Sequence, residues 1–307
     1  MSNVVVQESL PDLKPRIMEF ARRASTEVTT HDEGLVPVLA ETLGPGSTVY
    51  VAHTPKATLE DVVRVSVKIA SSGLRASPHI VARRVPSERA LRDALLELRQ
   101  AGIEQVLVIA GDRDEPLGPF ANSLDVIGTL ALRESGMRRV GVAGHPEGHK
   151  SVEPAVLWQA LRQKQDFAER TGIAVHIVTQ FGFSALAVCR WRRLLCDNGV
   201  LLPVHVGIAG PTSLPKLLRF AVQCGVGASM NSLLKNKSLL QNMARPAISP
   251  EGMIAALVSE GAGFELPQLV QPHVFAFGGA LKSAQWMRAV SEGLFEVQSD
   301  GTLSLYS

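Results

Sequence analysis

Short apolar runs recur along the chain at intervals of roughly 25–30 residues, and amphipathic stretches separate most of them. Most of these runs are rich in Val and Ile and nearly continuous in apolarity, which is typical of parallel strands covered by helices. The rhythm predicts a single-domain α/β fold, the (β/α)8 TIM barrel, whose strand ends gather on one face. The eight predicted strands are Ala24–Thr29, Thr48–His53, Ser77–Val81, Gln105–Ala110, Arg139–Ala143, Ala174–Thr179, Pro203–Gly207 and His273–Phe277.

The stretches between the strands carry the signals of helices. Leu91, Leu95 and Leu98 recur at i, i+4 and i+7, the spacing of a buried helix face. Ser and Thr suit the amino-terminal caps of helices, and glycine suits the carboxyl ends, where the backbone turns to positive φ. We predict helices over Leu59–Ser72, Glu88–Ala101 and Glu153–Thr171, with Thr58 and Ser87 as caps and Gly73, Gly102 and Gly172 at the ends.

Two segments flank the predicted barrel. Residues 1–22 form a polar leader that contains a short helix, and the barrel extends over residues 23–293. In the tail, residues 294–307, the pair Asp300-Gly301 separates two apolar patches, which predicts a small hairpin.

The long connection between the seventh and eighth strands predicts an extra helix over Ser229–Pro246, before another near Pro250–Gly261.

Composition narrows the class of protein. The chain has 307 residues, of which 46% are hydrophobic and 20% charged, as is usual for a well-cored protein. The net charge is +2 and the basic residues are scattered, so no nucleic-acid surface is expected; Arg190, Arg192 and Arg193 are predicted to form a solvated helix face. The three cysteines have no C-x-x-C spacing, which favours neither a disulfide framework nor a zinc knuckle. Without a secretory pattern or a membrane-length apolar run, we expect a cytoplasmic protein.

Polar and glycine residues cluster where the predicted strands end. In barrel enzymes this face holds the active site. Five of the eight histidines fall in or beside these clusters, namely His53, His79, His145, His149 and His205. The other candidates on this face are Glu27, Asp112, Gln180 and Gly207.

Several barrel chemistries can be compared with these residues. A Schiff-base aldolase needs a lysine at a strand end, and the lysines fall in helices, loops or the leader. His145-Pro-Glu-Gly-His149 resembles a metal-ligand cluster, but its Pro and Gly favour a loop. Three interpretations of this segment remain open: the metal site of a hydrolase, a purely structural loop, or a contact to an organic cofactor. The sequence has neither G-x-G-x-x-G after the first strand nor G-x-x-x-x-G-K-[ST], which argues against a classical dinucleotide fold and a phosphate loop. Cys224 has no evident base beside it, so a thiol nucleophile is not supported.

The Ala110-Gly111-Asp112 turn is a further candidate. Gly111 lacks a Cβ, so backbone amides there can approach a ligand closely. Asp112 would then place a negative charge beside that ligand. The alternative is an ordinary strand-end turn with a solvated acid.

Taken in order, five segments resemble the methylenetetrahydrofolate reductase family, with agreeing spacing over about residues 24–280. The resemblance implies a flavin-dependent barrel. It would pass a hydride from NADH or NADPH through FAD to 5,10-methylenetetrahydrofolate and give 5-methyltetrahydrofolate, or run in reverse. The segments are Ser77–Ile80, Val108–Asp112, Val140–His149, Val178–Phe181, and Val206–Pro211 followed by Leu218–Ala221.

The resemblance also implies roles for individual residues. Glu27 matches the proposed general acid toward the folate, and Asp112 the aspartate that tunes the flavin and stabilises a cationic folate. Gln180 matches a glutamine that binds the pterin, and Gly207, Leu214 and Phe277 complete the expected substrate site. The expected FAD lining is His53, His79, Ala110, Gly111, Asp112, Phe120, Ala121, Ala143, His145, His149 and Lys164. No membrane or metal is implied, and the apolar tail either self-associates into a homo-oligomer or packs on the barrel.

The chain departs from the family pattern at several of these positions. Val28-Thr29-Thr30 follows Glu27 in place of aromatic and proline residues, and Glu19 is a rival for the acid. Ala110 replaces the usual arginine before Gly-Asp, and His145 replaces the usual tyrosine before Pro-Glu. Leu157 and Ala160 stand where an aspartate and an asparagine commonly hold the cofactor. An alternative function is therefore a flavin- or pterin-binding component without NAD(P)H activity that acts with a partner protein.

Overall fold

Eight parallel strands close into a barrel in the computed structural model, which describes residues 10–224, 250–263, 269–298 and 303–306. Each strand pairs with the next along the chain, and β1 pairs with β8 to complete the ring. The predicted TIM barrel is confirmed, and each observed strand overlaps its prediction. The strands are β1 (Ser25–Thr29), β2 (Thr48–Ala52), β3 (Arg75–Val81), β4 (Gln105–Ile109), β5 (Arg139–Gly144), β6 (Ala174–Thr179), β7 (Val204–Ala209) and β8 (Leu269–Phe275).

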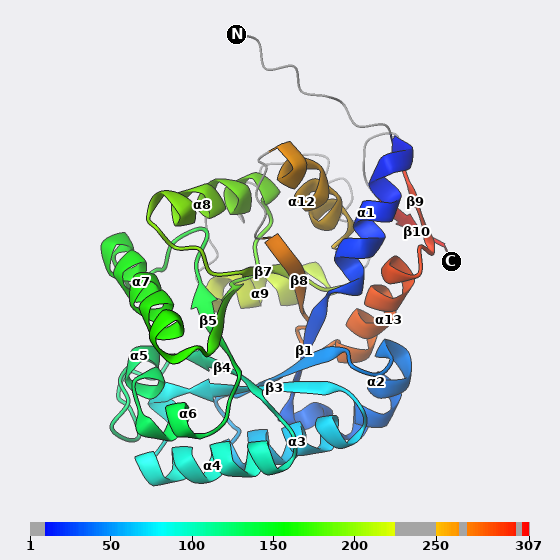
Figure 1. Ribbon diagram of the computed structural model, residues 1–307. Helices are drawn as coiled ribbons and strands as arrows, with labels where there is room; N and C mark the ends of the chain where they lie inside the picture. Colours follow the sequence, from blue (N-terminus) through cyan, green and yellow to red (C-terminus); the bar gives the residue numbers. More distant parts are fainter. Residues whose placement is uncertain (1–9, 225–249, 264–268, 299–302, 307) are drawn as a thin grey trace.

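Helices surround the strands on the outside of the barrel (Figure 1). Short 3-10 turns η1 (Thr30–Leu35) and η2 (Ala82–Arg84) follow β1 and β3. The helices are α1 (Leu10–Arg22), α2 (Val36–Leu43), α3 (Leu59–Ser71), α4 (Glu88–Gln100), α5 (Ser123–Ile127), α6 (Leu130–Glu134), α7 (Pro154–Thr171), α8 (Ala185–Asp197), α9 (Leu214–Cys224), α12 (Glu251–Gly263) and α13 (Ala280–Ser291). The extra helix predicted over Ser229–Pro246 lies outside the described residues.

Local sequence signals position the helices as predicted. The Ser87 hydroxyl accepts a hydrogen bond from the Ala90 amide at 3.1 Å and begins α4, whose buried face includes Leu91, Leu95 and Leu98. Thr58 caps α3 in the same way. Gly172 ends α7 with a φ of 73°, a conformation that costs glycine little.

One prediction for the outer helices is wrong. Arg192 on α8 is completely buried, whereas Arg190 and Arg193 are exposed as expected. Successive residues on a helix are about 100° apart, so these three side chains cannot share one solvated face. The arginine between the exposed pair lies on the packed side, beside Trp191 and Leu195.

The first and last described elements of the chain lie on one side of the barrel. Helix α1 lies beside α13 and the hairpin of β9 (Phe295–Val297) and β10 (Leu303–Leu305) (Figure 1). The two strands are antiparallel, which confirms the predicted hairpin, although Asp300-Gly301 lies outside the described residues. Phe295 is fully buried, so the tail packs within the chain. No helix among the described residues is long and apolar enough to cross a membrane.

The interior of the barrel holds a cluster of ring side chains with polar atoms. Tyr50 Oη lies 3.0 Å from His176 Nε2, and the His176 and His205 rings stack with centroids 4.2 Å apart. The His273 ring lies 4.6 Å from that of Tyr50, and its Nδ1 lies 3.0 Å from Ser25 Oγ. Barrels of this type usually fill this space with branched apolar residues. Burial lowers the pKa of all three histidines, so they are neutral near pH 7.

The placement of His205 corrects another prediction. It is the second residue of β7, so it lies toward the amino-terminal end of the barrel, away from the strand-end face. Its Nδ1 lies 3.2 Å from Gln271 Nε2 on β8. His205 therefore belongs to the interior cluster, while the other four predicted histidines remain candidates for the site.

Candidate active site

The carboxyl ends of the strands bring the predicted site residues together around the barrel mouth. Glu27 lies on β1 and His79 on β3, while His53 follows β2. Because the strands are parallel and the barrel is closed, these positions surround one opening. The remaining candidates lie on strand ends or in the segments that follow them: Ala110, Gly111, Asp112, Phe120, Ala121, Ala143, His145, His149, Lys164, Gln180, Gly207, Leu214 and Phe277.

Buried polar atoms without a partner gather at the ends of β2 and β3. His53 Nε2 lies 3.2 Å from the Ala57 carbonyl oxygen, but His53 Nδ1, Thr54 Oγ1 and His79 Nε2 have no hydrogen-bond partner among the described residues. Burial lowers the pKa of His53 and lowers that of His79 to about 3, with the nearby His53 contributing to the second shift. Both rings are neutral at pH 7. Buried polar atoms are normally paired, so these three suit a bound polar molecule.

The turn after β4 packs against the end of β3. Gly111 has a φ of 96°, and a Cβ added to it would lie 2.3 Å from Val81 Cγ1. The Arg83 amide also donates to the Ala110 carbonyl at 3.0 Å. The turn therefore requires glycine both for its conformation and for its close approach to Val81.

Asp112, at the end of this turn, forms an ion pair with Arg84 that the sequence did not predict. Arg84 Nη2 lies 2.6 Å from Asp112 Oδ1. Partial burial favours a higher pKa for Asp112, but the hydrogen bond and charge of Arg84 outweigh it and lower the pKa. Asp112 is ionised at neutral pH. The only local signal was a basic pair, Arg83-Arg84, just after a predicted strand.

The loop from Asp112 to α5 is fixed by its own contacts. Arg83 Nε donates to the Ala121 carbonyl at 2.7 Å, and Arg83 Nη1 donates to the Arg113 carbonyl at 2.7 Å. Asn122 caps α5, and Phe120 is buried. Phe120 and Ala121 are thereby held next to the turn.

A buried lysine lies near the histidines that follow β5. The His145 and His149 rings meet edge to face with centroids 5.0 Å apart. Burial lowers the pKa of Lys164 on α7 to about 8, and burial, His149 and Lys164 together lower the pKa of His145 to about 4. Lys164 is 6% exposed, and burial alone accounts for its lowered pKa, with no carboxylate among the described residues contributing. A bound anion would suit this buried cation. The described residues contain no group of three or more His, Cys, Asp or Glu side chains that could hold a metal.

The opposite side of the mouth is built around Gly207 on β7. Its amide donates to Thr179 Oγ1 at 2.8 Å, and a Cβ there would lie 2.7 Å from the Phe275 ring and 2.5 Å from the Thr179 carbonyl oxygen. The amide of Gln180 donates to the Gly144 carbonyl at 2.9 Å. Gly207 thus lets the end of β6 and the Phe275 ring approach each other.

Five phenylalanines pack above β6, β7 and β8. The Phe277 ring lies edge to face with Phe181 at 5.0 Å and 4.9 Å from Phe220. Phe277 has a φ of 48°, a strained backbone conformation for phenylalanine. Such a conformation persists only where the surrounding packing holds the residue in place. The sequence singled out Phe277 but not its partners, because their contacts join elements that are far apart in the sequence. These partners are Phe181 and Phe183 after β6, Phe220 on α9 and Phe275 at the end of β8.

Glu27 is the acid of this mouth. Burial raises its pKa to about 7, Asp32 contributes in the same direction, and a hydrogen bond from the Ala276 amide opposes the shift. The rival Glu19 lies on the outer face of α1, 55% exposed and 2.6 Å from Arg23 Nη2. Only Glu27 therefore faces the other candidates.

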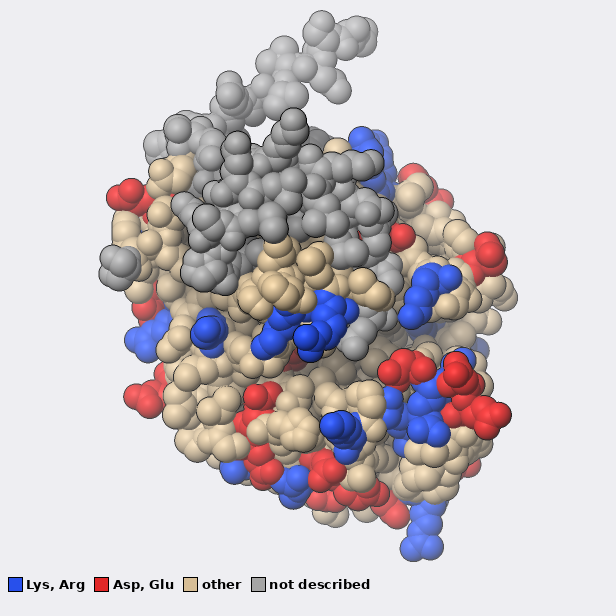
Figure 2. All heavy atoms as spheres, turned by 180° about the vertical axis from the view of Figure 1, so that it is seen from behind, with Lys and Arg blue, Asp and Glu red and all other residues tan. Residues whose placement is uncertain are grey.

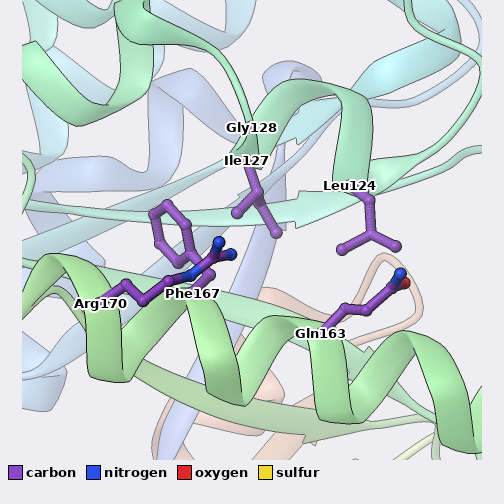
Figure 3. Close-up of a pocket in the computed structure, with 6 residues that line it drawn as sticks. All are labelled: Leu124, Ile127, Gly128, Gln163, Phe167 and Arg170. Atoms are coloured by element: carbon purple, nitrogen blue, oxygen red, sulfur yellow. The ribbon is translucent and has the colours of Figure 1, made fainter.

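A separate pocket of about 210 Å³ lies on the outer wall, between α5 and α7. Figure 3 shows Leu124 and Ile127 facing Phe167 and Gln163 across it. None of the predicted site residues lines this pocket. On the surface seen from behind in Figure 2, Lys and Arg are interspersed with Asp and Glu, which agrees with the scattered charges of the sequence.

Comparison of the sequence with models of protein families identifies the family of this chain. The model of the methylenetetrahydrofolate reductase family matches residues 42–241, about two thirds of the chain. The chain belongs to the methylenetetrahydrofolate reductase family. Membership indicates an oxidoreductase with a folate-related substrate.

Solved structures resemble the chain only distantly. Dihydropteroate synthase from Thermus thermophilus is 14% identical, with a TM-score of 0.45 over 87% of this chain and 93% of that one. The 3-dehydroquinate dehydratase from Aquifex aeolicus is 11% identical, with a TM-score of 0.44 over 88% and 97%. Neither similarity bears on the activity of this chain.

Proposed function

We propose that this reductase-family protein is an FAD-dependent methylenetetrahydrofolate reductase. It would transfer a hydride from NADH or NADPH to 5,10-methylenetetrahydrofolate and form 5-methyltetrahydrofolate, or catalyse the reverse oxidation. The observation that carries the proposal is a carboxylic acid next to unpartnered polar atoms on neighbouring strands. Glu27 on β1 has a pKa of about 7, and the unpartnered atoms of His53, Thr54 and His79 lie at the ends of β2 and β3, the two strands that follow β1 around the barrel.

The residues between β2 and α7 suit FAD. The free nitrogens of His53 and His79 and the Thr54 hydroxyl would hydrogen-bond the cofactor, and Lys164 would pair with a phosphate. Bound FAD would supply hydride transfer between the nicotinamide and the folate. The Gly111 turn after β4 would lie beside the cofactor. The rest of the proposed lining is Ala110, Asp112, Phe120, Ala121, Ala143, His145 and His149.

Glu27 and Asp112 would have opposite protonation states. With a pKa of about 7, Glu27 is protonated in a substantial fraction of molecules at neutral pH and can give its proton to a nitrogen of the folate. That proton would open the methylene bridge to a cationic iminium. Asp112 remains ionised beside Arg84 and would stabilise positive charge on the folate.

The other side of the mouth would bind the folate. Gln180 offers a side-chain amide at the end of β6, where Gly207 lets the end of this strand pack closely against the Phe275 ring. Phe277 and Leu214 would contact the apolar part of the pterin. The Phe277 ring is held in place by Phe181 and Phe220.

A second function is favoured by α7. Leu157 and Ala160, which stand where the family commonly has Asp and Asn, are half-buried apolar residues that offer the cofactor no hydrogen bond. The chain would then be a flavin- or pterin-binding component that needs a partner protein for NAD(P)H-linked turnover.

The visible spectrum of the purified protein distinguishes these functions. Flavin absorbance that NADH or NADPH bleaches under anaerobic conditions supports the reductase. Flavin that only 5-methyltetrahydrofolate bleaches supports the partner-dependent component. A protein that binds no FAD, even when FAD is added in excess, contradicts the reductase and leaves only a pterin-binding component.

A further inference from the structure

Arg84 ties three loops of the mouth together. It is the last residue of η2, and its side chain is only 8% exposed. One guanidinium nitrogen, Nη2, lies 2.6 Å from Asp112 Oδ1, and the other, Nη1, donates to the Pro55 carbonyl at 3.3 Å. These contacts link the segments after β2, β3 and β4.

The two members of this ion pair differ greatly in exposure. Asp112 is 70% exposed, so its carboxylate lies at the surface of the mouth while the counter-charge lies beneath it. The guanidinium of Arg84 supplies a positive charge in a planar group that matches carboxylate geometry. Water screens a pair less when one member is buried. Asp112 therefore presents the outer edge of an ion pair, in which Arg84 offsets part of its negative charge.

The arginine of this ion pair does not come from the position before Gly111-Asp112. Ala110 occupies the place where the family pattern has an arginine, and a methyl group cannot reach or neutralise the neighbouring carboxylate. The guanidinium comes instead from the segment after β3. Arg83, the adjacent basic residue, does not replace it, because its nitrogens bond the carbonyls of Ala121 and Arg113.

We infer that Arg84 is a positioning residue that fixes the Asp112 carboxylate and offsets its charge at the flavin. The inference rests on the proposed FAD function. Reduction adds negative charge to a flavin, so a lone carboxylate beside it would disfavour the reduced form, and a lone guanidinium would favour it. The pair keeps these two effects in balance.

A charge cycle on the FAD-loaded protein tests this role. Arg84→Met leaves Asp112 alone and should shift the flavin equilibrium about tenfold toward the oxidised form, a midpoint potential about 30 mV lower. Asp112→Asn leaves the buried arginine alone and should shift it about tenfold the other way. The double variant Arg84→Met/Asp112→Asn should return to within about threefold of the wild type, and Arg84→Lys should restore most of the effect. Anaerobic equilibration with a reference dye measures each value.

A matched ion pair at the other end of the same strand provides the control. Arg99 Nη1 lies 2.9 Å from Glu104 Oε1, just before β4, whereas Asp112 follows β4. Arg99→Met should therefore leave the midpoint potential unchanged. If Arg84→Met does not fold, we compare the midpoint potential of Asp112→Asn with those of the double variant and Arg84→Lys. That comparison still gives the direction in which the arginine shifts the potential.

The outcomes separate the inference from the function on which it rests. Wild-type protein that binds no FAD overturns both. Protein that binds FAD but keeps the same potential in Arg84→Met and Asp112→Asn overturns only the role of Arg84. Equal shifts in Arg84→Met and Arg99→Met would indicate general loosening of β4 and would likewise overturn it.

Discussion

Tyr50 Oη and His176 Nε2 lie 3.0 Å apart inside the barrel, on strands β2 and β6. This contact joins the two sides of a buried cluster that also contains His205 and His273. A barrel that buries neutral imidazoles depends on pH for its stability, because each ring must stay unprotonated to remain buried.

We expect the protein to lose stability as the pH falls below about 6.5. Burial lowers the pKa of His205 to about 4, and charge from Arg139 contributes. The unfolded chain therefore binds more protons than the folded one between these pH values, and stability falls through that range. His205→Gln should flatten the pH profile by about 1–3 kcal/mol between pH 7 and pH 4. Urea unfolding at several pH values measures it.

The exposed His31 provides a control for that profile. His31→Asn should leave the slope of stability against pH as it is in the wild type. If His205→Gln and His31→Asn gave the same profile, acid sensitivity would not come from the interior cluster.

Replacing Glu27 with glutamine should separate the two half-reactions. Glutamine keeps the shape of the side chain but cannot donate the proton required by the folate. Turnover of methylenetetrahydrofolate should fall by about 100-fold or more, while anaerobic bleaching of the flavin by NADH or NADPH persists. Stopped-flow absorbance follows each half-reaction. Glu19→Gln is the control, and loss of both half-reactions in Glu27→Gln with FAD still bound would reject the assignment.

The same variant should change stability with a definite sign. The pKa of Glu27 in the folded protein, about 7, lies above its ordinary value of 4.5. The folded protein therefore keeps this proton up to a higher pH than the unfolded chain does. The contribution of Glu27 to wild-type stability therefore decreases as the pH rises from about 4.5 to about 7, opposite in sign to that of the buried histidines. Glu27→Gln should be more stable than the wild type at pH 8 by about 1–3 kcal/mol, with a smaller difference at pH 4.5. Equal differences at both pH values would argue against a buried acid.

Gly111→Ala should disrupt the turn that carries Asp112. The added Cβ would lie 2.3 Å from Val81 Cγ1, and alanine is also strained at a φ of 96°. Gly102→Ala isolates the second cost, because Gly102 has a φ of 77° with no atom within 4 Å of an added Cβ. We expect Gly111→Ala to lose about 2–4 kcal/mol of unfolding free energy and Gly102→Ala about 1 kcal/mol. Val81→Ala should recover part of the difference, and similar losses in both glycine variants would show that close packing is unimportant.

Lys164→Met should weaken FAD binding by about tenfold or more, since a buried cation and an anionic phosphate form a strong pair. The pKa of Lys164, lowered by burial to about 8, also predicts that FAD affinity in the wild type decreases as the pH rises through 8. Quenching of flavin fluorescence measures the affinity. The exposed Lys282 on α13 offers a matched control, and an equal loss in Lys282→Met would exclude a specific role for Lys164.

Local sequence was sufficient for much of the fold. The strand over Ala174–Thr179 matches its prediction residue for residue, and Ser87 caps α4 as expected. Such features depend on neighbours a few residues away, so periodicity and cap chemistry predict them. The parallel, closed order of the strands followed from the regular alternation of strands and helices.

The candidate site was only partly predictable for a related reason. His53, His79 and Asp112 could be placed at strand ends because a barrel gathers those ends on one face. His205 was misplaced because the sequence did not show which end of the barrel interior it occupies. Arg192 was misjudged because helix rotation, not proximity in sequence, decides which side chain is buried.

The amino-acid sequence by itself determined the barrel, its helices and caps, and the family to which the chain belongs. Only the tertiary structure decided that Arg84 pairs with Asp112, that Glu27 rather than Glu19 faces the mouth, and that histidines fill the interior. The physical reason is the range of the interactions. Caps and periodicity act within a few residues, whereas ion pairs, desolvation and ring packing depend on atoms that folding brings together from distant parts of the chain.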